Sequence, residues 1–154
     1  MKKIAAFLIC IVLLFSLCSC DTTSRVINSL PDYESRELFY EQDSFRDYTD
    51  YARYRYKSVS EKDLLETDYF RKITADDTER ILAHIENFEM WVEVVDWKEN
   101  YDFDKSIVST DDFFYLYTKA GQRFNQYSNY EEFDVYKLFY FDIDMQILYY
   151  FSKC

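Results

Sequence analysis

The chain has 154 residues and carries 29 acidic against 18 basic side chains, for a formal net charge of −11. A surface this acidic disfavours nucleic acid and is repelled by anionic lipid headgroups, so we exclude nucleic acid and keep a basic protein as a candidate partner. With one Gly and one Pro in the whole chain, turns must be built largely from Asn, Asp and Ser.

The N-terminal segment has the features of an export signal. Lys2 and Lys3 precede an apolar run over residues 4–17 that only Ser16 interrupts, and small or polar residues follow at once. A helix that spans a bilayer needs about 18 or more apolar residues, so a secretory signal explains this run better. We predict a signal peptide over residues 1–19.

The segment LCSC at residues 17–20 resembles the lipobox of bacterial lipoproteins. This resemblance implies that Cys20 becomes the lipidated first residue of the mature protein, held on the extracytoplasmic side of the cell membrane. Two acyl chains hold a protein stably, whereas one chain holds it only marginally. Cys18 is the weaker candidate because bulky Leu17 would stand next to the cut. The alternative is an ordinary secretory signal cut near Ser19.

Cleavage would leave an acidic protein with little cysteine chemistry. The net charge would change from −11 to −13 with the loss of two lysines. Cys154 would be the single thiol left, so no internal disulfide could form.

Residues 20–37 are mostly polar, include Pro31 and have little periodicity. We predict that they form a lipidated tether, which would hold the domain roughly 20 to 25 Å from the anchor. The rest of the chain, residues 38–154, is expected to form a single α+β domain.

Three segments then open with a hydroxyl residue followed three positions later by Asp, the pattern of a helical capping box. They begin at Ser44, Ser60 and Thr74. After Ser44, apolar residues recur at helical spacing as far as Tyr56, which predicts a helix. A strand through residues 53–57 is the alternative.

The longest helix is expected over residues 74–95. Apolar residues recur there with the spacing of one buried stripe, and glutamates mark an acidic face opposite. The stripe consists of Ile81, Ile85, Phe88, Val92 and Val95.

Residues 111–118, 133–142 and 145–151 are rich in aromatic and β-branched residues, which favours strands. We predict an α+β fold with N-terminal helices packed on a C-terminal antiparallel β-meander of three or more strands. Both faces of these strands carry apolar side chains, which a sheet covered on one side would not need. Either the protein's own helices cover both faces, or one face is a tyrosine-rich surface open to a partner. The tyrosines expected to form that surface are Tyr115, Tyr117, Tyr136, Tyr140 and Tyr149.

Residues that could carry catalysis are few. His84, the one histidine, lies at the edge of the buried stripe, and we expect it to pack there. One His and one free Cys cannot form the usual zinc site, so we expect no metal and no cofactor. Acidic pairs at 102/104, 111/112 and 142/144 are expected to bond turn amides, with calcium as the alternative.

The C-terminal segment YKLFYFDIDMQILYYFSKC is similar to the terminal hairpin of small bacterial proteins of unknown function, and this likeness implies no activity. We therefore expect a membrane-anchored extracytoplasmic lipoprotein that is not an enzyme and serves as a binding or accessory module at the cell envelope. The alternative is an acidic inhibitor or immunity protein that neutralises a basic toxin. An enzyme acting on envelope glycans comes third.

Overall fold

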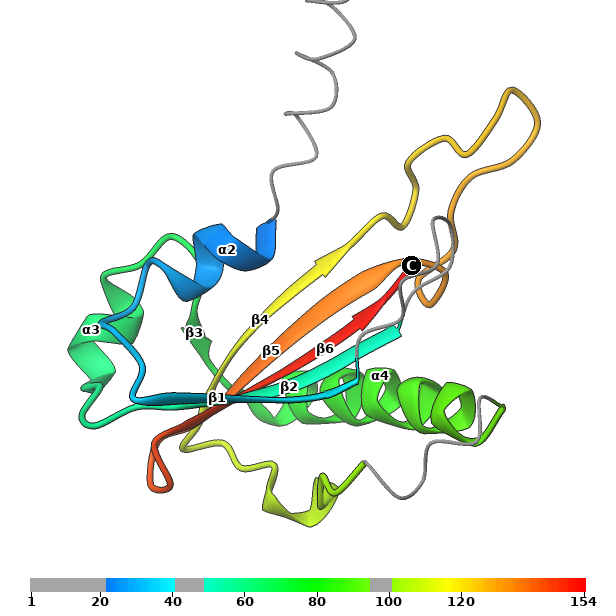
Figure 1. The fold of residues 1–154 in the computed structure, drawn as a ribbon. Coiled ribbons are helices and arrows are strands. Elements are labelled where there is room, and N and C mark those ends of the chain that lie inside the picture. Colours follow the sequence, from blue (N-terminus) through cyan, green and yellow to red (C-terminus); the bar gives the residue numbers. More distant parts are fainter. Residues whose placement is uncertain (1–21, 41–48, 95–100) are drawn as a thin grey trace, which may run out of the picture.

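A computed structural model describes residues 22–40, 49–94 and 101–154, which form a six-stranded antiparallel sheet with helices on both faces (Figure 1). The strand order is β1-β2-β6-β5-β4-β3, so the C-terminal strands occupy the centre of the sheet. The expected α+β class is confirmed. In chain order the elements are α2 (Thr22–Ile27), β1 (Ser35–Tyr40), β2 (Thr49–Arg55), α3 (Glu61–Leu65), β3 (Arg71–Lys72), α4 (Ala75–Val94), the 3-10 helix η2 (Lys105–Ile107), β4 (Phe113–Thr118), β5 (Tyr136–Asp142) and β6 (Ile147–Lys153).

The predicted C-terminal meander is present as β4, β5 and β6. Strands β2 and β1 extend it beyond β6, and the two-residue strand β3 extends it beyond β4. A tight turn joins β5 to β6 and ends at Gln146, whose φ is 56°. The Gln146 side chain accepts a hydrogen bond from the Val59 amide at 2.5 Å and donates one to the Val59 carbonyl oxygen at 3.2 Å. These bonds tie the turn to the segment that follows β2.

Alternate residues of the central strands enter two separate cores. On one face, Phe113 pairs across to Phe141, and Phe141 pairs to Leu148. On the opposite face, Phe114 pairs to Tyr140. Because side chains on a strand alternate between the two faces, a central strand that is apolar throughout must be covered on both sides.

Helix α4 covers one face along its length. It spans Ala75–Val94, close to the expected residues 74–95. Ile81, Ile85 and Phe88 are fully buried, and they pack against β6 and β5 residues such as Phe151. Val92 belongs to the same core, so four of the five stripe residues expected from the sequence lie on the contact face of the helix. The fifth, Val95, lies outside the described residues.

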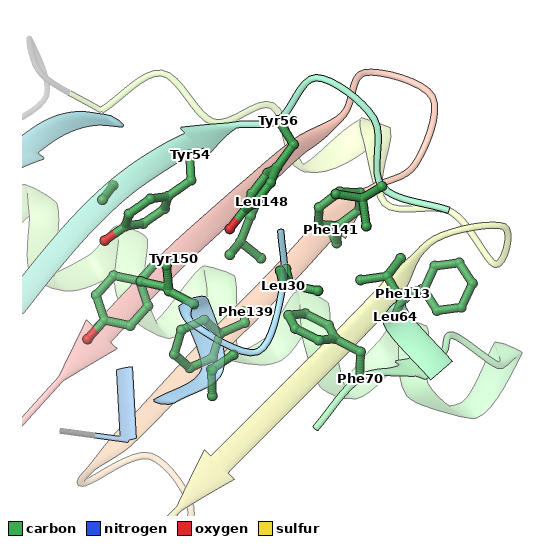
Figure 2. Packing of buried hydrophobic residues seen from close by; sticks show 14 residues of the cluster. Leu30, Tyr54, Tyr56, Leu64, Phe70, Phe113, Phe139, Phe141, Leu148 and Tyr150 are labelled. Atoms are coloured by element: carbon green, nitrogen blue, oxygen red, sulfur yellow. The ribbon is translucent and has the colours of Figure 1, made fainter. Parts of the chain in front are cut away.

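Short elements cover the other face. Val26 of α2 and Leu64 of α3 are fully buried, and both belong to a cluster with Tyr54, Phe139 and Phe141 of the sheet. Figure 2 shows this cluster, in which aromatic rings from β2, β4, β5 and β6 meet Leu64 of α3 and Leu30 of the segment after α2. The protein's own helices thus cover both faces. This agrees with the first of the two alternatives, and not with an open tyrosine-rich face.

Two local predictions are corrected. Residues 22–37 do not form a tether, because α2 folds onto the sheet, Leu30 is buried and β1 begins at Ser35. The helix expected after Ser44 is also wrong from Thr49 onward, where β2 pairs with β6. Strand β2 pairs with β1 on one side and β6 on the other, and this pairing outweighed the weak helical preference that the spacing of its apolar residues indicated.

The predicted signal peptide, Cys20 and the start expected at Ser44 lie outside the described residues. Within the described part of the chain, no helix combines the length and apolarity that crossing a membrane requires.

Candidate functional site

The tyrosines expected to form one partner surface lie on opposite faces of the sheet. Tyr140 is fully buried and Tyr149 is 8% exposed, on the face that α4 covers. Tyr136 is fully buried on the same face, where its hydroxyl donates to the His84 carbonyl oxygen of α4 at 2.9 Å. Tyr115 and Tyr117 are half-buried. The proposed surface is therefore corrected, because three of its five members face the protein core.

Strand register separates the two groups. Tyr115 pairs with Phe139, so Tyr115 lies on the face opposite Tyr140, which pairs with Phe114. A shift of one residue moves every side chain of a strand to the other face, and only pairing decides that shift. Tyr115 contacts Tyr69 edge to face, with ring centroids 5.2 Å apart.

Tyr69 lines an open hollow of about 500 Å³ between the end of α2 and α3. We call it the acidic hollow, because three of its lining side chains are carboxylates. Its remaining lining comes from the segment after α2 and from the turn after α3. The lining residues are Ser29, Leu30, Pro31, Asp63, Glu66, Thr67, Asp68 and Tyr69.

Local sequence chemistry places these carboxylates. Ser60 begins α3 with the predicted capping box: its hydroxyl accepts from the Asp63 amide, and Asp63 Oδ2 accepts from the Ser60 amide at 2.8 Å. After the helix, the Thr67 hydroxyl oxygen accepts from the amides of Tyr69 and Phe70, which holds the turn. The helix end and this turn place Glu66 and Asp68 at the hollow's edge.

The chemistry of the acidic hollow favours binding of cations over acid catalysis. Hydrogen bonds from Ser60 lower the pKa of Asp63, so this group is an anion at neutral pH. A general acid needs the opposite shift. Glu66 lies 3.5 Å from Lys62, but both side chains are largely exposed, so this pair is weak and screened by salt. A partner's ammonium or guanidinium group could replace it.

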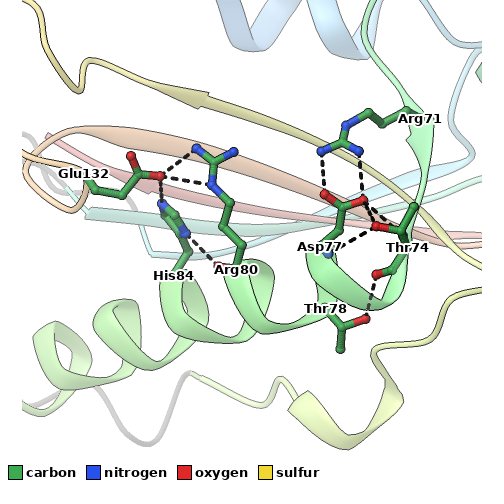
Figure 3. Close-up of polar contacts among 7 residues, drawn as sticks. All are labelled: Arg71, Thr74, Asp77, Thr78, Arg80, His84 and Glu132. Carbon is green, nitrogen blue, oxygen red and sulfur yellow. Dashed lines mark hydrogen bonds and ion pairs between the residues drawn. The ribbon is translucent and has the colours of Figure 1, made fainter.

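A second cluster joins α4 to the segment before β5 (Figure 3). His84 is fully buried, as expected of a packing residue, with its ring 4.8 Å from those of Phe133 and Tyr136. Its Nδ1 donates to the Arg80 carbonyl oxygen at 2.8 Å, and its Nε2 lies 3.5 Å from Glu132. Burial lowers the pKa of His84, so the ring is neutral at pH 7 and serves structure.

Figure 3 also shows how α4 begins. Asp77 accepts from both the amide and the hydroxyl of Thr74, which confirms the predicted capping box at this position. Arg71 donates two further hydrogen bonds to Asp77, at 2.6 and 2.8 Å. Although burial alone would raise the pKa of Asp77, these hydrogen bonds lower it.

The acidic pairs have different roles. Asp104 accepts from the Ser106 amide and Asp142 from the Met145 amide, as expected of turn residues. Asp102 instead accepts from Tyr51 at 3.1 Å and from Arg53 at 2.6 Å, which links β2 to the segment before η2.

Asp112 is buried at 4% exposure and lies 2.5 Å from the Tyr140 hydroxyl oxygen, which is also 2.9 Å from the Ile107 carbonyl oxygen. Tyr140 has one proton and can donate to only one of them. Both contacts become hydrogen bonds when a protonated Asp112 donates to Tyr140 and Tyr140 donates to Ile107. Burial, with the nearby charges of Asp142 and Asp144, raises the pKa of Asp112 accordingly.

Within the described residues no group of three or more His, Cys, Asp or Glu side chains has an arrangement that would hold a metal ion. Sequence reasoning missed the acidic hollow because the segment after α2 was taken for a tether. The one available signal was the acidic run from Asp63 to Asp68 beside a helix start.

Comparisons of the chain with protein families, with curated proteins and with solved structures find no match.

Proposed function

We propose that this chain is a membrane-anchored extracytoplasmic lipoprotein whose domain binds a basic segment of a partner protein in the acidic hollow. The observation that carries the binding role is the hollow itself, which is lined by three carboxylates and by half-buried Tyr69. Cationic side chains form charge pairs with carboxylates and cation–π contacts with aromatic rings. The anchor rests on LCSC at residues 17–20.

The net charge supports the same partner class. At −11 the chain attracts cationic proteins over distances near the Debye length, about 10 Å at 0.1 M salt. Long-range attraction would speed encounter, and the hollow would select a partner with a basic segment at its surface. Binding should therefore weaken as salt is raised.

The binding proposal is tested by photo-crosslinking in the cell envelope. A photoreactive residue replaces Ser29, which lines the hollow and is exposed, and in a matched variant it replaces Met90, which is 58% exposed on α4. We expect a basic protein to crosslink at position 29 in a salt-sensitive way and not at position 90. Equal adducts at both positions, or none at position 29, would contradict the proposal.

Charge reversal tests which carboxylates matter. Glu66→Lys with Asp68→Lys should abolish the adduct at position 29. Glu79→Lys with Asp111→Lys changes the net charge equally at exposed positions outside the hollow and should leave most of the adduct. If both pairs reduced the adduct alike, overall charge and not the hollow would be responsible.

The anchor is tested separately by labelling with fatty acid. Cys20→Ala should abolish the label and release the protein from the membrane or leave it unprocessed. Cys18→Ala is the matched control and should keep the label. A Cys20→Ala protein that still carries fatty acid would show that the lipobox is misplaced.

A second candidate function, neutralisation of a basic toxin, is favoured by the same acidity. It differs in its consequence, because a toxin would lose its activity when bound one to one by this protein. A captured partner that stays active in the complex would favour the binding or accessory role.

A further inference from the structure

Residues 119–130, between β4 and β5, form a projecting hairpin that we call the aromatic arm. The Gly121 amide donates to the Tyr130 carbonyl oxygen at 2.9 Å, and the Phe124 amide donates to the Ser128 carbonyl oxygen at 3.0 Å. Gly121 has a φ of +76°, a conformation that glycine adopts without strain. The arm is thus an ordered structure with its own hydrogen bonds.

The tip of the arm presents aromatic rings to solvent. Tyr127 is 89% exposed and Phe124 is 64% exposed. Asn125 Oδ1 accepts from the amides of Tyr127 and Ser128 at 2.8 and 3.1 Å, so the tip has a defined turn. Phe124 also contacts Tyr130 edge to face, with centroids 5.3 Å apart. Single exposed rings are common on proteins, but here a hairpin holds two of them at its end.

Contacts to the body of the domain fix the arm at its base. Arg80 of α4 donates to Glu132 at 2.7 and 3.1 Å (Figure 3). The Phe133 ring packs on His84, with ring centroids 4.8 Å apart. The Lys119 amide donates to the Val135 carbonyl oxygen at 3.0 Å. The direction in which the arm projects is therefore set by α4 and by the strands that it joins.

The charge of the arm is opposite to that of the chain. Residues 119–130 include Lys119 and Arg123 and no acidic residue, whereas the whole chain has a net charge of −11. Arg123 is exposed, and the Lys119 ammonium lies 5.4 Å from the centre of the Tyr130 ring. Aromatic rings beside basic groups are typical of segments that sit among lipid headgroups.

The first described residues of the chain lie on the same side as the base of the arm. Thr23 of α2 accepts from the Lys137 ammonium at 2.8 Å, and Lys137 is the second residue of β5, close after the arm. Cys20 precedes Thr22 by two residues, so their Cα atoms are at most about 7 Å apart. Figure 1 shows the arm (yellow to orange) rising on the side of the sheet that carries α2, with α4 on the other side.

We infer that the aromatic arm docks against the lipid headgroups of the membrane that holds the Cys20 anchor. The inference rests on the proposed lipid anchor. Tyr127 and Phe124 enter the interface, and Lys119 and Arg123 offset the repulsion between the acidic domain and anionic lipid. The anchor and the arm together then hold the domain on the membrane in one orientation.

The test places a polarity-sensitive fluorophore on the full-length lipidated protein in vesicles of zwitterionic and anionic lipids. Gln126→Cys puts the label at the exposed tip of the arm. Met145→Cys puts it on the β5–β6 turn at the other end of the sheet, where the Met145 side chain is 58% exposed. Both variants carry Cys154→Ser, which removes the remaining thiol. Flotation and fatty-acid content are measured first.

We expect the label at position 126 to emit at shorter wavelength and to be quenched by spin-labelled headgroups, while the label at position 145 emits as in water. Adding Phe124→Ser and Tyr127→Ser should return position 126 to the emission in water without detaching the protein. Two results would overturn the docking inference and leave the anchor in place. In one, the protein floats while the label at position 126 emits as in water; in the other, that label changes its emission only when a soluble envelope protein is added. Protein that carries no fatty acid and does not float would overturn the anchor as well.

Discussion

The two faces of the sheet are both buried, but different kinds of structure cover them. One 20-residue helix, α4, covers the first face with a regular apolar stripe. The second face is covered by the short helices α2 and α3 and the segments around them. Short helices have little stability of their own, so tertiary contacts must hold the second cover in place.

The faces also differ in the polar groups that they bury. His84 and Asp112 lie on the α4 side. Burial lowers the pKa of His84 and raises the pKa of Asp112, and both shifts favour the neutral form of the side chain. On the other side the Thr23 hydroxyl and the Tyr150 hydroxyl lie 3.0 Å apart. The α4 side should therefore respond to pH more strongly than the other.

The largest effect is expected from Ile85→Asp. Ile85 is fully buried under α4, so the variant would bury an unpaired charge and lose on the order of 5 kcal/mol, comparable to the whole stability of a small domain. Circular dichroism during thermal unfolding measures this. Met90→Asp, at a 58% exposed site on the same helix, should cost at most about 1 kcal/mol. Similar melting of both variants would mean that another face of α4 is buried.

Val26→Asp tests the second cover. Val26 is fully buried in α2, so we expect a loss of about 3 kcal/mol in the free energy of unfolding, measured in urea. Arg25→Asp, its exposed neighbour, should change stability by about 0.5 kcal/mol or less. If the two variants were equally stable, residues 22–30 would behave as the tether that the sequence suggested.

The start of α4 is expected to contribute a smaller, pH-dependent amount. Asp77→Ala removes the cap and the partner of Arg71, and should cost about 1 to 2 kcal/mol at pH 7. Because the pKa of Asp77 is lowered in the fold, its contribution is present above the ordinary value of 3.8 and is lost as the pH falls below it. Urea unfolding of wild type and Asp77→Ala at pH 7 and below pH 3.8 checks this. A stability difference between the two proteins that is larger in acid would contradict it.

Asp112→Asn should stabilise the protein at pH 7 by about 1 kcal/mol. The amide oxygen can still accept from the Ile143 amide, and its NH₂ group can donate to Tyr140. Because the pKa of Asp112 is raised, its favourable contribution is present below 3.8 and is lost as the pH rises through the folded pKa. The advantage of Asn should therefore vanish in acid. A variant less stable than wild type at pH 7 would show that the ionised carboxylate is needed.

Sequence periodicity predicted the α4 side well. The stripe through Ile81, Ile85 and Phe88 and the capping box at Thr74 are local patterns, and a long helix repeats its pattern often enough to be recognised. The second side was harder to predict, because α2 has six residues and the apolar residues Val26, Ile27 and Leu30 stand in a polar segment. The acidic hollow depends on that segment and was missed with it.

The amino-acid sequence by itself predicted the α+β class, the central strands, α4 and the chemistry of its first turn. Each of these leaves a periodic or capping pattern among residues close in the chain. Strand register, the folding of α2 onto the sheet and the opening of the acidic hollow were decided only by tertiary structure. Tyr115 and Tyr140 illustrate the difference. Each is a strand tyrosine in the sequence, and pairing with distant residues alone determines which face each one occupies.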